Sequence, residues 1–286
     1  MVRPVSVGLN GSPESVAAAH WAAREARLRG VPLRLVYAWE WLPKHLPPTP
    51  AEPGFDQHWP ERMMGEVAKD IESRHPQLKT TVEQIENLPI PTLLETAEES
   101  EVLALGSRGL GTIAGFLAGS VSLAVVARAV RPVVLVRATT GHETAEAVGE
   151  VVVGVDLGQP CEPLLEFAFD FAAAHQVPVR ALHAWHSPPS YGYLPKEVDV
   201  GALGGQERAG LAAALRPWRE KHPSIAVYEQ LVPERPAHHL IQAASGAALL
   251  IVGRRTEPAR LGTHLGAVAH AVVHHAPCPV AIVPHP

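Results

Sequence analysis

The sequence predicts two repeated α/β domains, each built on a doubly wound parallel sheet. The chain repeats itself with an offset of 146 or 147 residues, since Gly8 recurs as Gly154 and Pro132 recurs as Pro279. That offset is far longer than the roughly 20–50 residues of a solenoid repeat and matches the size of one domain. In both halves, short runs that are apolar on both faces alternate with helical patterns, as in a parallel sheet covered on both sides.

The first copy is expected to occupy residues 1–140. Pro13 suits the first turn of a helix and Gly30 its end. Six prolines between Pro43 and Pro60 predict an irregular loop. Apolar runs of strand length predict the strands Val2–Leu9, Leu33–Trp39, Thr80–Ile85, Val102–Leu105 and Val133–Val136, and helical patterns predict the helices Pro13–Arg29, Glu61–Ser73, Pro91–Glu99 and Ser120–Val130.

The second copy, residues 147–286, follows the polar linker Thr139–Glu150 and repeats the order. It is predicted to contain the strands Val151–Val155, Val179–Trp185, Ala226–Gln230, Ala248–Val252 and Val280–Val283, and the helices Pro163–His175, Gln206–Lys221, Pro236–Gly246 and Gly266–His275. The last strand of each copy would be an apolar sheet edge, which is prone to pair with other chains. We therefore expect the two last strands to pair with each other about a pseudo-two-fold axis, or with a second chain in a homodimer.

The composition is that of a soluble globular protein, with 47% hydrophobic and 19% charged residues among 286. The net charge of −5 is spread along the chain, which argues against a nucleic-acid partner. No apolar run approaches the ~18 residues of a membrane span and the N-terminus lacks a signal-peptide pattern, so we expect a cytoplasmic protein with no membrane partner. Cys161 and Cys278 form no paired motif and are expected to be buried, reduced thiols.

The clearest functional pattern follows the predicted strand Val102–Leu105. Gly106-Ser-Arg-Gly109 is followed after nine residues by Gly119-Ser120, which opens a helix. Gly106 would let the chain turn sharply, Gly109 would let backbone approach a ligand, and the helix start would offer N–H groups to an anion. The alternative is an ordinary glycine-rich turn followed by a helix cap.

In this context the spacing G-x2-G-x9-G-S resembles the ATP-binding signature of the universal stress protein family. "VSVGLNGS", "LRLVYAW" and "ARAVRPVVLV" in the first copy, and "RALHAW" and "VVHHAPCPVAIV" in the second, carry the same resemblance over essentially the whole chain. The resemblance implies a tandem member with two Rossmann-like, adenine-nucleotide α/β domains. In the first copy it implies phosphate contacts at Gly106, Gly109, Gly119, Ser120 and Val121, with adenine packing near Leu9, Ala38 and Leu105.

Asn10 occupies a position that is usually Asp in the family. An amide can still accept a hydrogen bond from a ribose hydroxyl, but it is uncharged and a poor metal ligand. The expected cofactor is therefore ATP, with a role of this position in holding Mg²⁺ left in doubt and no protein metal site expected.

The second copy keeps the acid but departs from the signature in its phosphate loop. Asp156 is the expected acid, while Thr256 replaces the second glycine and Ala267 replaces the serine. A lost hydrogen bond would weaken binding by about 0.5–1.5 kcal/mol, so this site is predicted to be degenerate rather than absent. Arg254 and Arg255 are either compensating phosphate partners or solvated surface residues. The residues implied for this site are Val155, Asp156, Ala184, Val252, Gly253, Gly266, Ala267 and Val268.

No catalytic constellation accompanies the loop. His270 and His274 are four residues apart on a predicted helix, but no third ligand is spaced to complete a metal site. The sequence contains no nucleophile elbow, no Walker A motif and no dinucleotide fingerprint, and no general base is evident. We therefore expect no enzyme, with slow ATP hydrolysis at most.

Two functions remain open. The first, implied by the resemblance, is an ATP-binding regulator in the response to stress or dormancy, acting through nucleotide-dependent contact with an unidentified protein partner. The alternative is a structural interaction module with a vestigial nucleotide site.

The asymmetry between the copies predicts one tight ATP site per chain. The first site should bind at micromolar affinity or better, about −8 kcal/mol, and the second about tenfold to a hundredfold more weakly. Calorimetry on nucleotide-stripped protein measures both. Replacing Gly109 by a bulky residue should remove the tight site, and two equal sites would contradict the assignment.

Overall fold

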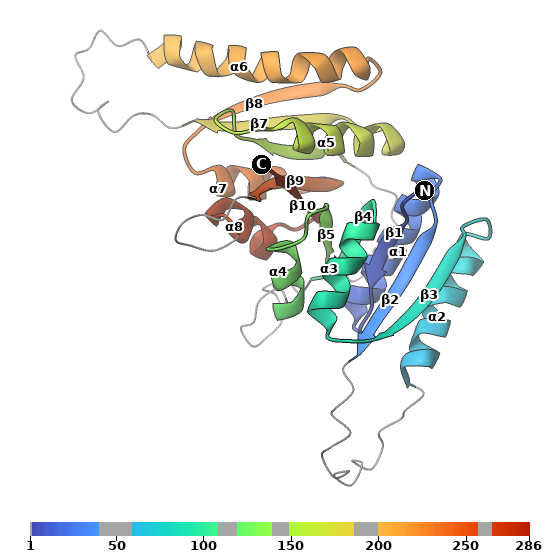
Figure 1. Ribbon diagram of the computed structural model, residues 1–286. Coiled ribbons are helices and arrows are strands. Elements are labelled where there is room, and N and C mark those ends of the chain that lie inside the picture. The colour runs from blue at the N-terminus through green and yellow to red at the C-terminus, as the bar shows by residue number, and fades with distance from the viewer. Residues whose placement is uncertain (1, 40–58, 108–118, 139–148, 186–199, 257–264) are drawn as a thin grey trace. The chain divides into compact units, whose positions relative to one another are not determined.

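The computed structural model describes residues 2–39, 59–107, 119–138, 149–185, 200–256 and 265–286. The chain divides into two compact units, Met1–Thr144 and Ala145–Pro286, here called unit one and unit two (Figure 1). The predicted linker Thr139–Glu150 and the proline-rich stretch after Trp39 lie almost entirely outside the described residues.

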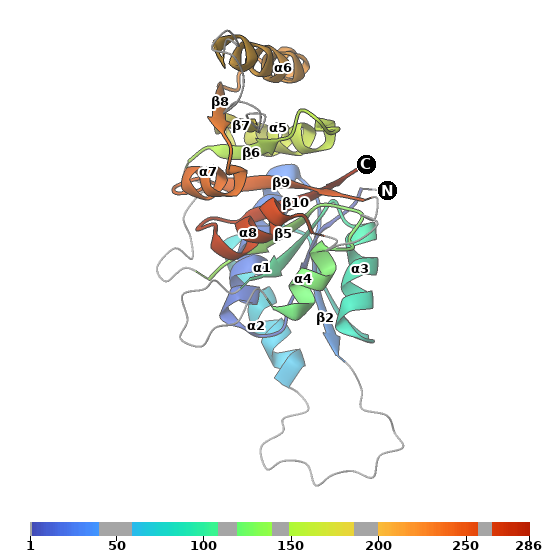
Figure 2. The same cartoon turned by 90° about the vertical axis from the view of Figure 1, so that its left-hand side faces the viewer.

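Unit one contains one parallel sheet with helices on both faces. Its described strands are β1 (Val5–Gly8), β2 (Leu33–Trp39), β3 (Thr80–Glu86), β4 (Val102–Gly106) and β5 (Val133–Val136), in the spatial order β3-β2-β1-β4-β5. Helices α1 (Pro13–Arg29) and α2 (Trp59–Arg74) cover one face, and α3 (Pro89–Glu99) and α4 (Ser120–Val126) cover the other (Figure 2). The strand order reverses between β1 and β4, which is where ligands bind in sheets of this kind.

Unit two repeats this layout. Its described strands are β6 (Val151–Val155), β7 (Val179–Trp185), β8 (Val227–Pro233), β9 (Leu249–Arg255) and β10 (Val280–His285), all parallel in the order β10-β9-β6-β7-β8. Helices α5 (Glu162–His175) and α6 (Val200–Lys221) lie on one face, with α7 (Pro236–Ala243) and α8 (Ala267–His275) on the other. Two doubly wound α/β domains are thus confirmed.

Local sequence explains why α1 starts and stops where predicted. The Ser12 hydroxyl accepts a hydrogen bond from the Ser15 N–H at 3.2 Å, and Pro13 takes the first helical position, where no N–H is needed. Gly30 ends the helix in the left-handed conformation, with φ of 66°. Every strand residue of β1 except Gly8 is buried, as expected for a central strand in a sheet covered on both faces.

Several predicted boundaries are wrong, and one difference matters for the site. β9 was expected to end at Val252 and β10 at Val283, but both continue because their extra residues pair with each other, Arg254 with Pro284 and Arg255 with His285. Elsewhere α4 stops at Val126 instead of Val130, and α6 begins at Val200 rather than Gln206. A glycine in a helix is unfavourable by only about 1 kcal/mol, so the glycines at the start of α6 do not end it.

The pairing of the last strand of each copy with the other, or with a second chain, stays a prediction.

The core of unit two should depend strongly on Phe169. Its ring is fully buried and stacks on Trp218 of α6 at a centroid distance of 5.8 Å. Phe169→Ala should lower the free energy of unfolding by about 3–5 kcal/mol, measured by urea denaturation. Val82→Ala, at an exposed position of β3, is the control and should change it by less than about 0.5 kcal/mol. A change below about 1 kcal/mol for Phe169→Ala would contradict this packing.

Candidate functional site

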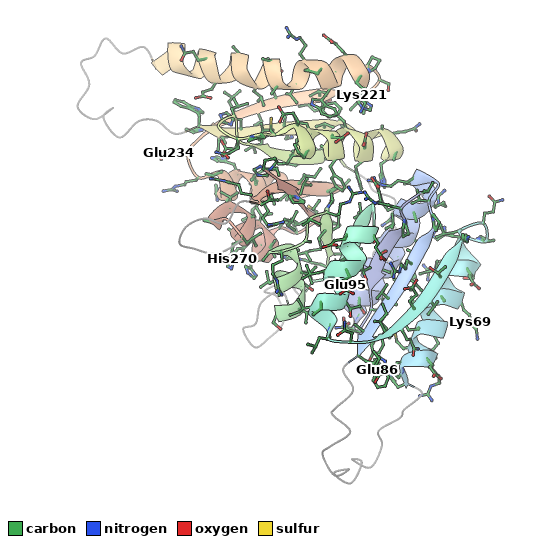
Figure 3. All side chains as sticks on the ribbon, viewed as in Figure 1. Lys69, Glu86, Glu95, Lys221, Glu234 and His270 are labelled. Carbon is green, nitrogen blue, oxygen red and sulfur yellow. The ribbon has the colours of Figure 1, made fainter. Side chains whose placement is uncertain are left out.

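The predicted adenine-side residues of unit one lie at the carboxyl ends of adjacent strands. Leu105 is the neighbour of Gly8 in the sheet, and the Leu9 N–H donates to the Val36 carbonyl at 2.8 Å, so β1 ends between β2 and β4. Leu9 and Leu105 are buried, and Ala38 is half-buried. Glu86 marks the same edge of the sheet in unit one, and Glu234, just after β8, marks it in unit two (Figure 3).

The predicted phosphate-side residues lie at the start of α4. Gly119 and Ser120 are exposed and Val121 is half-buried, with no side chain capping the helix. The Ser122 hydroxyl donates to the Gly106 carbonyl at 3.0 Å. This hydrogen bond holds the first turn of α4 against the end of β4, and so brings the two ends of the glycine motif together. Gly109 lies outside the described residues.

Gly106 has a different role from the one predicted. It is the last residue of β4, paired with Val136, and its φ is not positive, so it makes no sharp turn. A Cβ on Gly106 would lie 2.6 Å from the Ser15 nitrogen and 2.7 Å from the carbonyl carbon of Glu14. Glycine is needed because the first turn of α1 rests directly on the end of β4.

Ser107, next along the chain, has a buried hydroxyl. The side chain is 2% exposed, and its Oγ has no hydrogen-bond partner in the described part of unit one. Buried polar atoms are nearly always paired, so an orphaned hydroxyl inside the glycine motif indicates an unfilled interaction at this point.

Asn10 and Asp156 build the same turn in the two units. The Asn10 Oδ1 accepts from the Ser12 N–H at 3.1 Å, and the Asp156 Oδ1 accepts from the Gly158 N–H at 3.0 Å. Both side chains are exposed. The amide therefore replaces the carboxylate in its structural role, while the site of unit one lacks the negative charge.

Sequence reasoning missed an aromatic pair beside this turn. Gly11 has φ of 78°, and a Cβ there would lie 2.4 Å from Cη2 of Trp59, so the indole rests on the glycine. Tyr37 meets the same indole edge-on, with the ring centroids 6.5 Å apart, and Trp59 is 42% exposed. The contact between Gly11 and Trp59 is hidden in the sequence because 48 positions separate the two residues along the chain.

Unit two has different side chains at the matching place. Leu157 corresponds to Gly11, and it packs on α6, where a Cβ on Gly210 would lie 3.1 Å from its Cδ1. His183 corresponds to Tyr37 and is buried, with Nδ1 2.9 Å from the Val155 carbonyl and Nε2 3.1 Å from Glu207. Comparing the two copies position by position is the signal that reveals both exchanges.

The remaining residues predicted for unit two occupy equivalent positions. Gly266 precedes α8 with φ of −60° and is exposed like Ala267. Val155 and Val252 are buried, while Ala184 and Val268 are half-buried.

The end of β9 differs from the end of β4. A Cβ on Gly253 would lie 2.7 Å from Nε2 and 2.8 Å from Cδ2 of His285, which is 8% exposed. Thr256 donates through its N–H and its hydroxyl to the His285 carbonyl, at 2.8 and 3.1 Å. The glycine is thus covered by an imidazole that is not among the residues predicted for this site.

The two arginines of this segment behave differently. Arg254 is 6% exposed, its guanidinium donates to the Arg255 carbonyl at 3.3 Å, and burial lowers its pKa. The interpretation of Arg254 as a solvated surface residue is therefore wrong, because the extended strand turns it inward. Arg255 is exposed.

Other candidate chemistry stays unassembled in the described residues. The rings of His270, labelled in Figure 3, and His274 are 4.5 Å apart on α8, but the described part of the chain holds no group of three metal-ligating side chains. Cys161 and Cys278 are buried and unbridged. Among the described helices, none is long and apolar enough to cross a membrane.

Comparisons with known proteins identify relatives over the whole chain. The model of the universal stress protein family matches residues 1–137 and again 148–284. Universal stress protein Rv2005c of Mycobacterium tuberculosis is 33% identical over 288 residues, covering 97% of this chain and 96% of that protein. A universal stress protein from Archaeoglobus fulgidus has a TM-score of 0.64 at 17% identity, covering 98% of both chains. A shorter one solved with dAMP covers 48% of the chain at a TM-score of 0.35, too low to carry its ligand over.

His285 should make stability depend on pH. Burial lowers its pKa below the usual 6.5, Arg255 and Arg254 act in the same direction, and the Pro286 carbonyl and Asp156 oppose them. The unfolded chain therefore binds more protons below about pH 6.5, so the stabilisation by neutral His285 is lost as pH falls through the folded-state pKa. In urea unfolding between about pH 7.5 and 5, His285→Gln should lose less stability than the parent chain. His275→Gln, at an exposed site, is the control. Parallel pH curves for His285→Gln and the parent would contradict this.

Proposed function

Because the chain belongs to the universal stress protein family, with two family domains in tandem, we propose that it is an ATP-binding regulator whose working nucleotide site is in unit one. The observation that carries the proposal is the hydrogen bond from Ser122 Oγ to the Gly106 carbonyl. It holds Gly119 and Ser120 beside the end of β4, where the strand order reverses and a nucleotide would lie.

The two ends of this site suit the two ends of a nucleotide. Leu9 and Leu105 provide a buried apolar floor for a base, with Ala38 at its margin. Gly119 and Ser120 offer exposed backbone N–H groups and a hydroxyl, which are donors for phosphate oxygens. The orphaned hydroxyl of Ser107, the residue after Gly106, supports a ligand that completes the hydrogen bonds of the motif.

The residues of the site support binding more than turnover. Asn10 supplies no carboxylate at the end of β1, so this position suits neither a general base nor Mg²⁺. We therefore propose a nucleotide-dependent switch of the stress or dormancy response in the cytoplasm, with hydrolysis slow or absent. Its output would be contact with a protein partner that prefers one nucleotide state.

A second candidate is an interaction module whose nucleotide sites are both vestigial. It is favoured by unit two, where a folded copy of the same domain has Thr256 and Ala267 in the glycine motif and an imidazole on Gly253. If unit one behaved alike, the chain would act through its surface alone.

Gly119→Trp separates the two functions. A Cβ at Gly119 meets nothing within 4 Å and its φ is −49°, so the fold should tolerate the substitution and only a ligand would be displaced. In calorimetry with ATP, the variant should lose the tight site by at least about a hundredfold, or about 2.8 kcal/mol.

Gly266→Trp in unit two is the matched control, since Gly266 is equally open with φ of −60°. It should leave the tight site intact. If the parent chain shows no tight site, or if Gly119→Trp retains it, the ATP-binding function is wrong and the interaction module is favoured.

A further inference from the structure

We propose that His285 closes the nucleotide site of unit two, so that this residue determines which of the two related sites accepts adenine nucleotide. The inference rests on the proposed function of unit one. It differs from the expectation drawn from the sequence, in which Thr256 and Ala267 alone weakened the second site.

The imidazole of His285 lies directly on a glycine of β9. Gly253 corresponds to Gly106, the last residue of β4, but β9 continues for two more residues to Arg255. The His285 ring lies on this glycine, with Nε2 and Cδ2 within 2.8 Å of where a Cβ would be. The ring therefore fills this side of Gly253, as the backbone of the first turn of α1 fills the same side of Gly106.

The ring takes the place that the first turn of α1 has in unit one. α1 begins five residues after Gly8, whereas α5 begins eight residues after Gly154, so α5 lacks the first turn of α1. In unit one that turn covers Gly106 with the Ser15 N–H. In unit two, His285 and Leu164 fill the space instead, with Leu164 Cδ2 3.2 Å from the Cβ position of Gly253. The first turn of a helix is thus replaced by an aromatic ring.

Strand pairing and hydrogen bonds hold His285 in this position. His285 pairs with Arg255 in the extended ladder, and its carbonyl accepts two hydrogen bonds from Thr256. Its Nδ1 lies 3.0 Å from the Pro286 carbonyl. In the described part of unit one, the ladder between β4 and β5 ends at Gly106 and Val136.

Unit two retains other residues of the predicted site in accessible positions. Asp156 is exposed at the end of β6, and Gly266 has open space around it at the start of α8. At the four defined positions of the G-x2-G-x9-G-S motif, unit two departs from unit one only at Thr256 and Ala267. Reversing these two departures together with removing the imidazole should therefore restore a site, and reversing the two motif residues alone should not.

The test uses the full-length chain carrying Gly119→Trp, which silences unit one, so that any remaining ATP binding belongs to unit two. In that background, Thr256→Gly with Ala267→Ser should show no binding in calorimetry at micromolar ATP. Adding His285→Ala should bring binding back by at least about tenfold. Thermal unfolding checks that each variant is folded, and His285→Ser provides a second small residue if the alanine variant is not.

Adding His275→Ala in place of His285→Ala is the matched control and should restore nothing. Binding by the chain that keeps His285, at the strength of the chain without it, would overturn the proposal. So would the absence of binding in folded variants that lack the imidazole. The proposed function is measured separately, by the tight site of the parent chain and its loss in Gly119→Trp.

Discussion

The nucleotide-binding region depends on what rests against one glycine at the end of a strand. Gly106 and Gly253 have no side chain, so a neighbouring element can approach the strand closely enough to touch the backbone. In unit one the neighbour is the first turn of α1, and in unit two it is the ring of His285. The same glycine position is therefore covered by the first turn of a helix in one copy and by an imidazole ring in the other.

This constraint links features that are far apart in each unit. A shorter helix at the start of unit two leaves room beside Gly253, and two extra residues of β10 bring an imidazole into it. The extension also fixes β9 as a regular strand past the glycine, which turns Arg254 inward and lowers its pKa by burial. The surroundings of the glycine motif in unit two thus depend on residues outside the motif itself.

The sequence was sufficient for the fold class, because buried strands and amphipathic helices have distinct periodicities and the repeat allowed each copy to support the other. It also placed Leu9, Leu105 and Gly119 in one region, since parallel strands share a carboxyl edge. The position of His285 on Gly253 could not be predicted from the sequence. The last residues of β10 become part of the strand only by pairing with β9, and a short stretch of sequence does not reveal its pairing partner. The contact of Trp59 with Gly11 was hidden for the same reason.

In the two units, different side chains fill the space between the turn after the first strand and the helix packed on it. This difference has a consequence for the history of the duplicated gene. In unit one a bulky Trp59 on the helix meets Gly11 of the turn, and in unit two Leu157 of the turn meets Gly210 on the helix. A recombinant that joined the turn of one copy to the helix of the other would either force leucine against indole or leave two glycines facing a void. Gene conversion across this segment would therefore be selected against, and the two halves are free to drift toward separate roles.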